Sequence, residues 1–244
     1  MEQLNGKVAV ITGASKGIGR ATALRLARDG VTLVAGATGW ERLEALKSEA
    51  AGMGAAIHVQ RCDVTCLADC EDLVESAVKR FGGVDILINN AGIGYSGPVV
   101  DSSPEEAETM VRVNVLGVYH MARSVLPVMI DRQKGDIVNI ASVAGLKYSP
   151  NFALYSATKF AVRAFSEGLR NEVQAHNIRV ATVNPGMVAT HFFDSFSAGG
   201  MSLPTDKGEL LKPEDIAEAI YFALTRPRSV ALNEVTVRPY WQER

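Results

Sequence analysis

The chain lacks the features that would direct it to nucleic acid, to a membrane or to secretion. Its 244 residues carry 25 Lys and Arg against 27 Asp and Glu, and the formal net charge of -2 provides no general attraction to nucleic acid or to an anionic membrane. No apolar run reaches the roughly 18 residues of a membrane-spanning helix. The amino terminus enters an apolar run without the basic stretch and cleavage site of a secretory signal. These absences predict a cytoplasmic protein without nucleic-acid or membrane partners.

Cysteine is also scarce, and the three residues present make no disulfide framework. Cys62, Cys66 and Cys70 recur every four residues, which on a helix would place them on one side. A tetrahedral metal site needs a fourth ligand, and the nearest histidine, His58, lies on the other side of a predicted strand end. We therefore expect reduced, partly buried thiols and no metal site.

What the chain does have is a regular alternation of short β-rich runs and longer stretches at helical spacing. The expected strands cover residues 7–12, 31–36, 55–60, 84–89, 135–141, 178–184 and 231–237. The expected helices cover residues 18–29, 40–51, 67–81, 104–131, 153–176 and 213–224. No linker or internal repeat divides the chain. The pattern predicts a single domain over residues 1–244, an α/β fold with a doubly wound, mostly parallel seven-stranded sheet of Rossmann type and helices on both faces.

In such a sheet, ligands bind beyond the carboxyl ends of the strands, and a glycine-rich turn follows the first expected strand. TGASKGIG, residues 12–19, joins this strand to a helix. Glycines allow a close approach of the backbone, and the helix amino end offers unpaired N–H groups to a pyrophosphate. A glycine triplet alone is a weak signal, because a tight turn without a ligand has the same composition.

Further motifs follow the later strands in a characteristic order. They are Asp63, NNAG at 89–92, Asn114, Ser142, YSATK at 155–159, PG at 185–186, and Thr190. With the T-G-x-x-x-G-x-G turn, this series resembles the short-chain dehydrogenase/reductase family in its compact single-domain branch, over residues 4 to about 190. Taken singly, each motif is as well explained by ordinary turn chemistry.

The resemblance implies a bound nicotinamide dinucleotide and a set of residues that contact it. Asp63 would accept a hydrogen bond from the adenine amino group, although it could equally cap the helix that follows. Thr190 would anchor the nicotinamide amide. The implied cofactor-binding residues are Gly13, Ser15, Lys16, Gly17, Ile18, Gly19, Thr38, Asp63, Val64, Asn90, Ala91, Gly92, Tyr155, Lys159, Pro185, Gly186, Val188 and Thr190.

Tyr155 and Lys159 lie four residues apart, so their side chains leave one face of a helix one turn apart. A free tyrosine has a pKa of about 10, and a nearby ammonium lowers that value. The family resemblance implies that Tyr155 is the catalytic acid or base, that Lys159 lowers its pKa and binds ribose, and that Ser142 orients the substrate oxygen. It also implies that Asn114, in a kinked helix, holds a relay water.

The choice of nicotinamide cofactor depends on the end of the second strand, where an acidic residue would pair with the ribose 2′-OH. Ala37 and Thr38 stand there instead, and the arginine often found in NADP enzymes is missing too. Lys16 supplies a positive charge near the same ribose. We expect NADP(H) to be preferred, with NAD(H) possible.

Apolar and aromatic residues dominate the expected substrate walls. Residues 190–211 form a long loop with the composition of a substrate-binding segment, which includes Phe192, Phe193, Phe196 and Met201; residues 145–152, Met187 and Val188 would add to the walls. A small to medium, largely apolar carbonyl compound or secondary alcohol fits this composition. The carboxyl-terminal NEVTVRPYWQER differs from many reductases of acyl-carrier β-keto groups. A 3-oxoacyl-carrier-protein reductase and a non-catalytic NADP-binding regulatory or scaffold protein nevertheless stay as alternatives. The resemblance also implies a homotetramer or homodimer that associates through the helices around 104–131 and 153–176.

Overall fold

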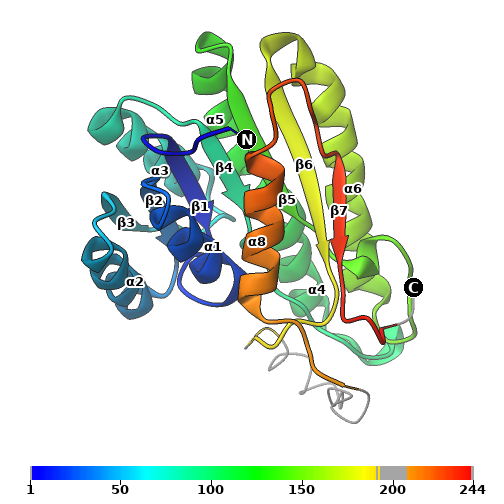
Figure 1. Ribbon diagram of the computed structural model, residues 1–244. Coiled ribbons are helices and arrows are strands. Elements are labelled where there is room, and N and C mark those ends of the chain that lie inside the picture. The colour runs from blue at the N-terminus through cyan, green and yellow to red at the C-terminus, as the bar shows by residue number, and fades with distance from the viewer. Residues whose placement is uncertain (1, 191, 193–207, 243–244) are drawn as a thin grey trace.

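The computed structural model describes residues 2–190, 192 and 208–242, and it confirms the doubly wound α/β fold in one domain. Seven parallel strands form one sheet in the order β3-β2-β1-β4-β5-β6-β7, so the strand order reverses between β1 and β4. The strands are β1 (Val8–Thr12), β2 (Thr32–Ala37), β3 (Ile57–Arg61), β4 (Ile86–Asn89), β5 (Gly135–Ile140), β6 (Ile178–Pro185) and β7 (Glu234–Val237). Their carboxyl ends point toward the lower edge of the molecule in Figure 1.

Helices cover both faces of this sheet. Helices α1 (Gly17–Ala27), α2 (Trp40–Gly52) and α8 (Pro213–Leu224) share one apolar cluster, and α1 and α8 lie in front of the sheet in Figure 1. Helices α3 (Leu67–Phe81), α5 (Gly117–Asp131) and α6 (Ala153–Val173) share a second cluster on the opposite face. Central strands are therefore covered on both sides, which explains why β1 and β4 are almost entirely apolar and why every residue of β5 is buried, including its polar ones.

The expected helix over 104–131 is not continuous. The chain forms α4 (Pro104–Val111), a π-helical turn (Arg112–Leu116) and then α5, and the N–H of Gly117 donates to the carbonyl of Arg112 five residues earlier. Such turns often occur at functional sites. The turn places Asn114 inside the fold, where 1% of its surface is exposed.

By length and composition alone, Pro104–Asp131 is long and apolar enough to cross a membrane, since an 18-residue window within it has a mean hydropathy of 1.3. A buried helix of a globular domain meets the same criteria. Met121, Val125 and Met129 of this segment are fully buried in the core cluster on the α5 face.

Other boundaries differ by a few residues from those that the sequence predicts. The last strand is shorter than the expected 231–237, and α6 ends at Val173 in a single 3₁₀ turn, Gln174–His176. Short 3₁₀ turns also occur at Val99–Asp101 and Val143–Gly145. Phe193, Phe196 and Met201 of the expected substrate loop lie outside the described residues.

The three cysteines do not share one helix, as their spacing would allow. Cys62 follows β3, Cys66 precedes α3 and Cys70 lies within it, with Cys62 and Cys70 buried and Cys66 exposed. All three are free thiols. A hydrogen bond with Cys62, together with burial, raises the pKa of the Cys70 thiol. Within the described ranges, no group of three or more His, Cys, Asp or Glu side chains is arranged to hold a metal.

Candidate active site

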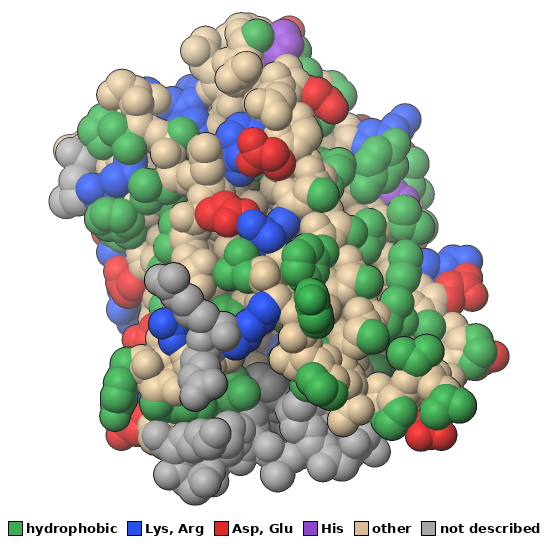
Figure 2. All heavy atoms as spheres, turned by 90° about the vertical axis from the view of Figure 1, so that its right-hand side faces the viewer, with side chains coloured by type: hydrophobic (Ala, Val, Ile, Leu, Met, Phe, Trp, Pro, Cys, Tyr) green, Lys and Arg blue, Asp and Glu red, His purple; other side chains and the backbone are tan. Residues whose placement is uncertain are grey.

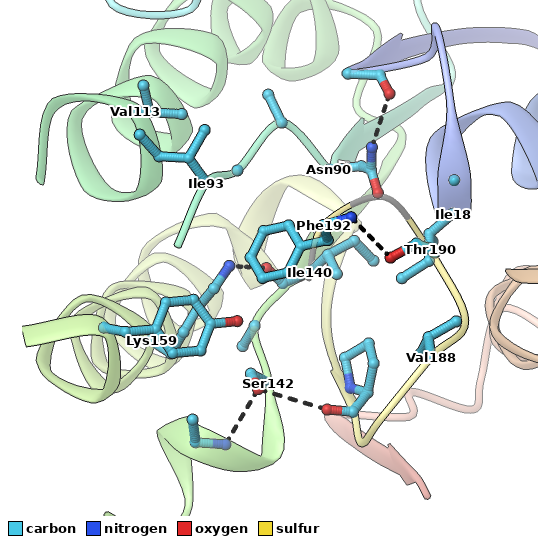
Figure 3. A pocket seen from close by; sticks show the side chains of 18 of the residues that line it. Ile18, Asn90, Ile93, Val113, Ile140, Ser142, Lys159, Val188, Thr190 and Phe192 are labelled. Carbon is cyan, nitrogen blue, oxygen red and sulfur yellow. Dashed lines mark hydrogen bonds between the residues drawn. The ribbon is translucent and has the colours of Figure 1, made fainter. Parts of the chain in front are cut away.

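A cavity of about 1120 Å³ opens at the carboxyl ends of the strands, where the sheet order reverses (Figure 3). It extends from the glycine turn and the end of β2 to Ser142, Tyr155 and Lys159. The residues expected from sequence that line it are Gly13, Ser15, Lys16, Gly17, Ile18, Thr38, Asp63, Val64, Asn90, Ala91, Gly92, Ser142, Tyr155, Lys159, Pro185, Gly186, Val188 and Thr190. Gly19 and Asn114 are not among the lining residues and lie beneath the cavity surface.

Asn90 holds the glycine turn against the end of β4. Its side-chain NH₂ donates to the backbone carbonyls of Thr12, at 3.0 Å, and Gly13, at 3.2 Å. A Cβ atom on Gly13 would lie 2.8 Å from this amide nitrogen, and one on Gly19 would clash with it. The hydroxyl of Thr12 accepts from the N–H groups of Asn90 and Ala91. Gly13 and Gly19 are therefore needed for this packing.

The far end of the cavity contains the groups that would meet an adenine ribose. Lys16 and Thr38 are exposed and line the cavity, and Gly39 lies so close to Ser15 that a Cβ there would be 3.4 Å from its hydroxyl. The carboxylate of Asp63 accepts from the N–H of Thr65 at 2.9 Å and from its hydroxyl at 2.8 Å. Asp63 thus closes a turn before α3 instead of capping that helix, whose first residue follows Cys66.

At the other end, Ser142, Tyr155 and Lys159 are all buried, with 9%, 8% and 5% of their surfaces exposed. The Ser142 hydroxyl accepts from the N–H of Ala144 at 3.1 Å, which fixes its position after β5. The ammonium of Lys159 donates to the carbonyl of Ile140 at 3.2 Å (Figure 3). Its nitrogen lies 5.8 Å from the centroid of the Tyr155 ring.

The pKa of Tyr155 differs from the sequence-based expectation. Burial raises it to about 12, and a hydrogen bond with Ser142 acts in the opposite direction. The rings of Phe152 and Phe192 flank the tyrosine ring, with centroids at 6.4 and 5.9 Å. Burial also lowers the pKa of Lys159 to about 8. The net pKa of Tyr155 is therefore raised and not lowered in this arrangement, because desolvation outweighs the hydrogen bond with Ser142.

Asn114 connects three parts of the site through its side chain. Its Oδ1 accepts from the N–H of Ile93 at 2.9 Å, and its NH₂ donates to the Ile93 carbonyl at 2.8 Å and to the Thr158 hydroxyl at 3.1 Å. The side-chain amide is thus fully engaged between the loop after β4 and α6. A Cβ on Gly92 would lie 3.3 Å from Asn114 Oδ1 and 3.6 Å from Lys159 Nζ, so the loop passes close to both groups.

Several lining residues were not anticipated from sequence. Trp241 and Gln242 reach the cavity from the carboxyl terminus, and Ile93, Tyr95 and Val113 line it too. Figure 3 shows Ile93 and Val113 across the pocket from Ser142. The remaining additions include Cys62, Thr65, Thr109, Arg112, Ile140, Ala141 and Ser156. Ser156 belongs to the YSATK motif, so position in that motif could have signalled it. No sequence motif identifies Trp241 or Gln242 as cavity residues, because only the fold brings the carboxyl terminus close to the segment after β6.

The cavity meets the requirements for a nicotinamide dinucleotide. Gly13 and Gly17 have φ angles of 62° and 56°, a conformation that glycine adopts without strain, and they bring the backbone to the cavity surface. The amino end of α1 supplies N–H groups there for a pyrophosphate. The buried hydroxyl of Ser156 has no hydrogen-bond partner among the described residues and lines the opposite end.

Comparisons with known proteins agree with this geometry. The sequence profile of the short chain dehydrogenase family matches residues 7–199. An uncharacterized oxidoreductase from Staphylococcus aureus (strain MRSA252) is 36% identical over 239 residues, which are 98% of this chain and 100% of the relative. The fold and cavity are those of a nicotinamide-dependent oxidoreductase. The chain belongs to the short-chain dehydrogenase/reductase family.

Two solved structures are similar to nearly the whole chain. An alcohol dehydrogenase from the archaeon Thermococcus sibiricus, complexed with 5-hydroxy-NADP, is 35% identical, covers 98% of each chain and has a TM-score of 0.89. An NAD⁺-bound xylitol dehydrogenase is 30% identical, covers 97% of this chain and 99% of its own, and has a TM-score of 0.90. Similar structures thus include complexes with both types of nicotinamide cofactor.

Proposed function

We propose that the protein is an NADP(H)-dependent oxidoreductase that interconverts a carbonyl group and a secondary alcohol in a small to medium, largely apolar substrate. The observation that carries this proposal is the burial of Ser142, Tyr155 and Lys159 in the same cavity as the glycine turn. When bound, the nicotinamide cofactor supplies or accepts the hydride at the substrate carbon.

Tyr155 is the proton donor to the substrate oxygen in the reductive direction. Its phenol is protonated throughout the neutral range because burial raises its pKa to about 12. Ser142 orients the same oxygen by hydrogen bonding. The hydrogen bond between the two hydroxyls supports this pairing, because one substrate oxygen can then meet both.

Lys159 binds the ribose hydroxyls next to the nicotinamide and returns a proton to Tyr155. Burial lowers its pKa to about 8, which favours exchange of a proton near neutral pH. Asn114 holds a relay water through its backbone carbonyl. The π-helical turn and the full engagement of its side chain support this assignment, because the backbone is then the group left for water.

The preference for NADP(H) rests on charge. The described lining of the cavity contains one carboxylate, Asp63, and four cationic side chains: Lys16, Arg112, Lys147 and Lys159. No acidic residue stands at Ala37 or Thr38, where it would repel a 2′-phosphate. Lys16 is the cation of the glycine turn and would meet this phosphate. We assign the remaining cofactor contacts to the other residues that the sequence predicts to bind the cofactor and that line the cavity.

The substrate would bind between apolar walls near Ser142. Ile93, Tyr95, Val113, Phe152, Met187 and Phe192 line this part of the cavity. The segment 190–211 would contribute further contacts, of which Thr190, Phe192 and residues 208–211 are described. Such a surface favours apolar substituents around a single reacting carbonyl group.

We also propose a cytoplasmic homo-oligomer that associates through α4, α5 and α6. Leu116, Tyr119 and Phe160 expose 43%, 46% and 38% of their surfaces there. Tyr119 of α5 contacts Phe165 of α6 edge-on, with centroids at 6.4 Å, so these exposed faces adjoin. Figure 2 looks onto the side of α6 and β7 and shows hydrophobic side chains gathered among charged pairs. Exposed apolar groups of this kind often mark an interface.

A substrate panel of ketones, aldehydes and alcohols, assayed with NADPH, NADH and their oxidised forms, tests the proposed function. We expect turnover of NADPH with at least one ketone. Tyr155→Phe should lower kcat by about two to four orders of magnitude, because it removes the general acid, with little change in NADPH affinity. Near-normal turnover of Tyr155→Phe would refute the catalytic assignment, and turnover with none of the compounds would favour a non-catalytic NADP-binding protein.

A further inference from the structure

The carboxyl-terminal turn, residues 239–242, packs against the segment that follows β6. The N–H of Gly186 donates to the carbonyl of Val237 at 2.7 Å, and the chain then reverses through a hydrogen bond from Gln242 N–H to the Pro239 carbonyl at 3.0 Å. The guanidinium of Arg238 donates to the carbonyl of Gln242 and closes the same turn. Trp241 and Gln242 consequently face the cavity, whereas Tyr240 between Pro239 and Trp241 is 93% exposed.

This turn lies at the substrate end of the cavity. The segment Pro185–Thr190 runs between the two ends: the Pro185 carbonyl is 3.5 Å from the Ser142 hydroxyl, whereas a Cβ on Gly17 would be 3.4 Å from Thr190. Gln242 meets this segment at its Ser142 end, where its Oε1 accepts from the N–H of Met187 at 3.0 Å. The turn therefore borders the reacting groups and not the glycine turn.

The bond from Met187 determines how the Gln242 amide points. A backbone N–H can only donate, so the oxygen of the amide must face Met187 and the NH₂ must point elsewhere. Within the described part of the chain, no hydrogen bond joins that NH₂ to another residue. A half-buried donor on a cavity wall is suited to an acceptor atom of a bound molecule.

Trp241 holds the neighbouring wall in place. Its indole N–H donates to the carbonyl of Glu209 at 2.9 Å, and Leu211 is joined to Met187 and Ala189 by backbone hydrogen bonds of 3.1 and 2.7 Å. A Cβ on Gly208 would lie 2.7 Å from the indole ring. The carboxyl terminus thus packs against residues 208–211 and presents an aromatic surface beside the Gln242 amide.

We propose that residues 241–242 form a substrate-recognition element in which the Gln242 NH₂ donates to a second oxygen acceptor of the carbonyl substrate and Trp241 contacts the apolar chain beside it. This inference rests on the proposed function, since it concerns the same cavity. It narrows the substrate class to carbonyl compounds that carry another carbonyl, ester or carboxylate oxygen. The reacting carbonyl stays with Ser142 and Tyr155.

Two ketones of equal chain length separate this role from general packing. Ethyl acetoacetate carries a second oxygen acceptor, and 2-heptanone has none. Gln242→Glu keeps an oxygen for the Met187 N–H and removes the donor, whereas Gln242→Met removes both. We expect either variant to lower the ratio of kcat/KM for ethyl acetoacetate to kcat/KM for 2-heptanone by about tenfold. This fold-change corresponds to the loss of one hydrogen bond that contributes roughly 1.4 kcal/mol. Tyr240→Ala, at the exposed neighbouring residue, is the control and should leave the ratio unchanged.

A binding measurement keeps the test independent of turnover. Trp40 and Trp241 are the two tryptophans of the chain, so Trp40→Phe leaves Trp241 as the sole fluorophore of that type. Quenching of its emission by each ketone, in the presence of NADP⁺, reports binding next to the turn. In Gln242→Glu, weaker binding of ethyl acetoacetate with unchanged binding of 2-heptanone supports the recognition role, even if neither ketone is reduced. The lack of reduction would then count against the proposed function only. An unchanged ratio in both Gln242 variants, or no binding of either ketone, overturns the inference.

Discussion

Lys159 and Tyr155 are buried together, with the Lys159 ammonium nitrogen 5.8 Å from the centroid of the tyrosine ring, and burial moves their two pKa values toward the neutral forms. A charged lysine in such a place costs stability, because water is removed from an ammonium that, among the described residues, donates a hydrogen bond to one backbone carbonyl. The same desolvation makes the pair suitable for proton exchange. Stability and catalysis therefore make opposite demands on Lys159.

We expect Lys159→Met to stabilise the protein at pH 7 while it abolishes turnover. A pKa lowered from 10.5 to about 8 corresponds to about 3 kcal/mol, and loss of the hydrogen bond to Ile140 removes about 1 kcal/mol of this gain. The free energy of unfolding, measured with urea, should thus rise by about 2 kcal/mol.

The pH dependence of this gain follows from linkage. Below pH 8 the lysine is charged in both states and the full desolvation cost is present; between pH 8 and 10.5 the folded state loses its proton first, so the cost disappears. The advantage of Lys159→Met should therefore vanish by about pH 10.5. Lys79→Met, at an exposed lysine, is the control and should show no such trend. A destabilised Lys159→Met at pH 7 would contradict the desolvation argument.

Lys16→Ala tests the choice of cofactor. An exposed ammonium near a phosphate contributes about 1 kcal/mol, so the Kd for NADPH should rise by about fivefold to tenfold, with little change in the Kd for NADH. Fluorescence titration of each reduced cofactor measures both constants, and Lys79→Ala serves as the control.

Thr38→Asp provides a test in the opposite direction. Its carboxylate would accept from a ribose 2′-OH and repel a 2′-phosphate, so the variant should favour NADH over NADPH. Wild-type preference for NADH, or equal losses for both cofactors in Lys16→Ala, would refute the assignment of Lys16.

Gly19→Ala and Gly168→Ala compare two glycines in helices with different surroundings. The added methyl at Gly19 would clash with Asn90 and with the Gly13 carbonyl, so we expect a loss of about 1 to 3 kcal/mol in the free energy of unfolding and weaker NADPH binding. Nothing lies within 4 Å of a Cβ at Gly168, so this substitution should stabilise α6 by about 0.5 to 1 kcal/mol. Equal changes in the midpoint of thermal unfolding for the two variants would show that the glycine turn can rearrange to accept the added methyl group.

Charge placed on the exposed apolar residues of the π-helical turn and α6 should disrupt the oligomer. A Leu116→Glu, Phe160→Glu double variant would bury two carboxylates in the proposed interface. We therefore expect the molar mass measured by light scattering to fall, from tetramer to dimer or from dimer to monomer. Met53→Glu, at a partly exposed residue at the end of α2, is the control and should leave the mass unchanged. A monomeric wild type would refute the oligomer directly.

Much of the fold could be predicted because it depends on local patterns. Runs of apolar residues longer than alternation allows predict strands covered on both faces, and β1 and β4 are buried in this way. The glycine turn and the motifs after β4, β5 and β6 were placed correctly along the cavity for the same reason, since carboxyl ends of parallel strands meet at one edge. The break at Arg112–Leu116 was anticipated only as a kink, because the sequence contains no proline there.

The amino-acid sequence by itself determined the order of strands and helices, the glycine turn and the set of groups available for proton and hydride chemistry. Only the tertiary structure decided their protonation and their neighbours. Phe152 and Phe192 desolvate Tyr155 from separate segments, which reverses the pKa shift that Lys159 was expected to cause. Gln242 reaches Met187 across 55 residues. Local spacing reveals which side chains share a helix face, whereas burial and long-range hydrogen bonds depend on how all the elements pack.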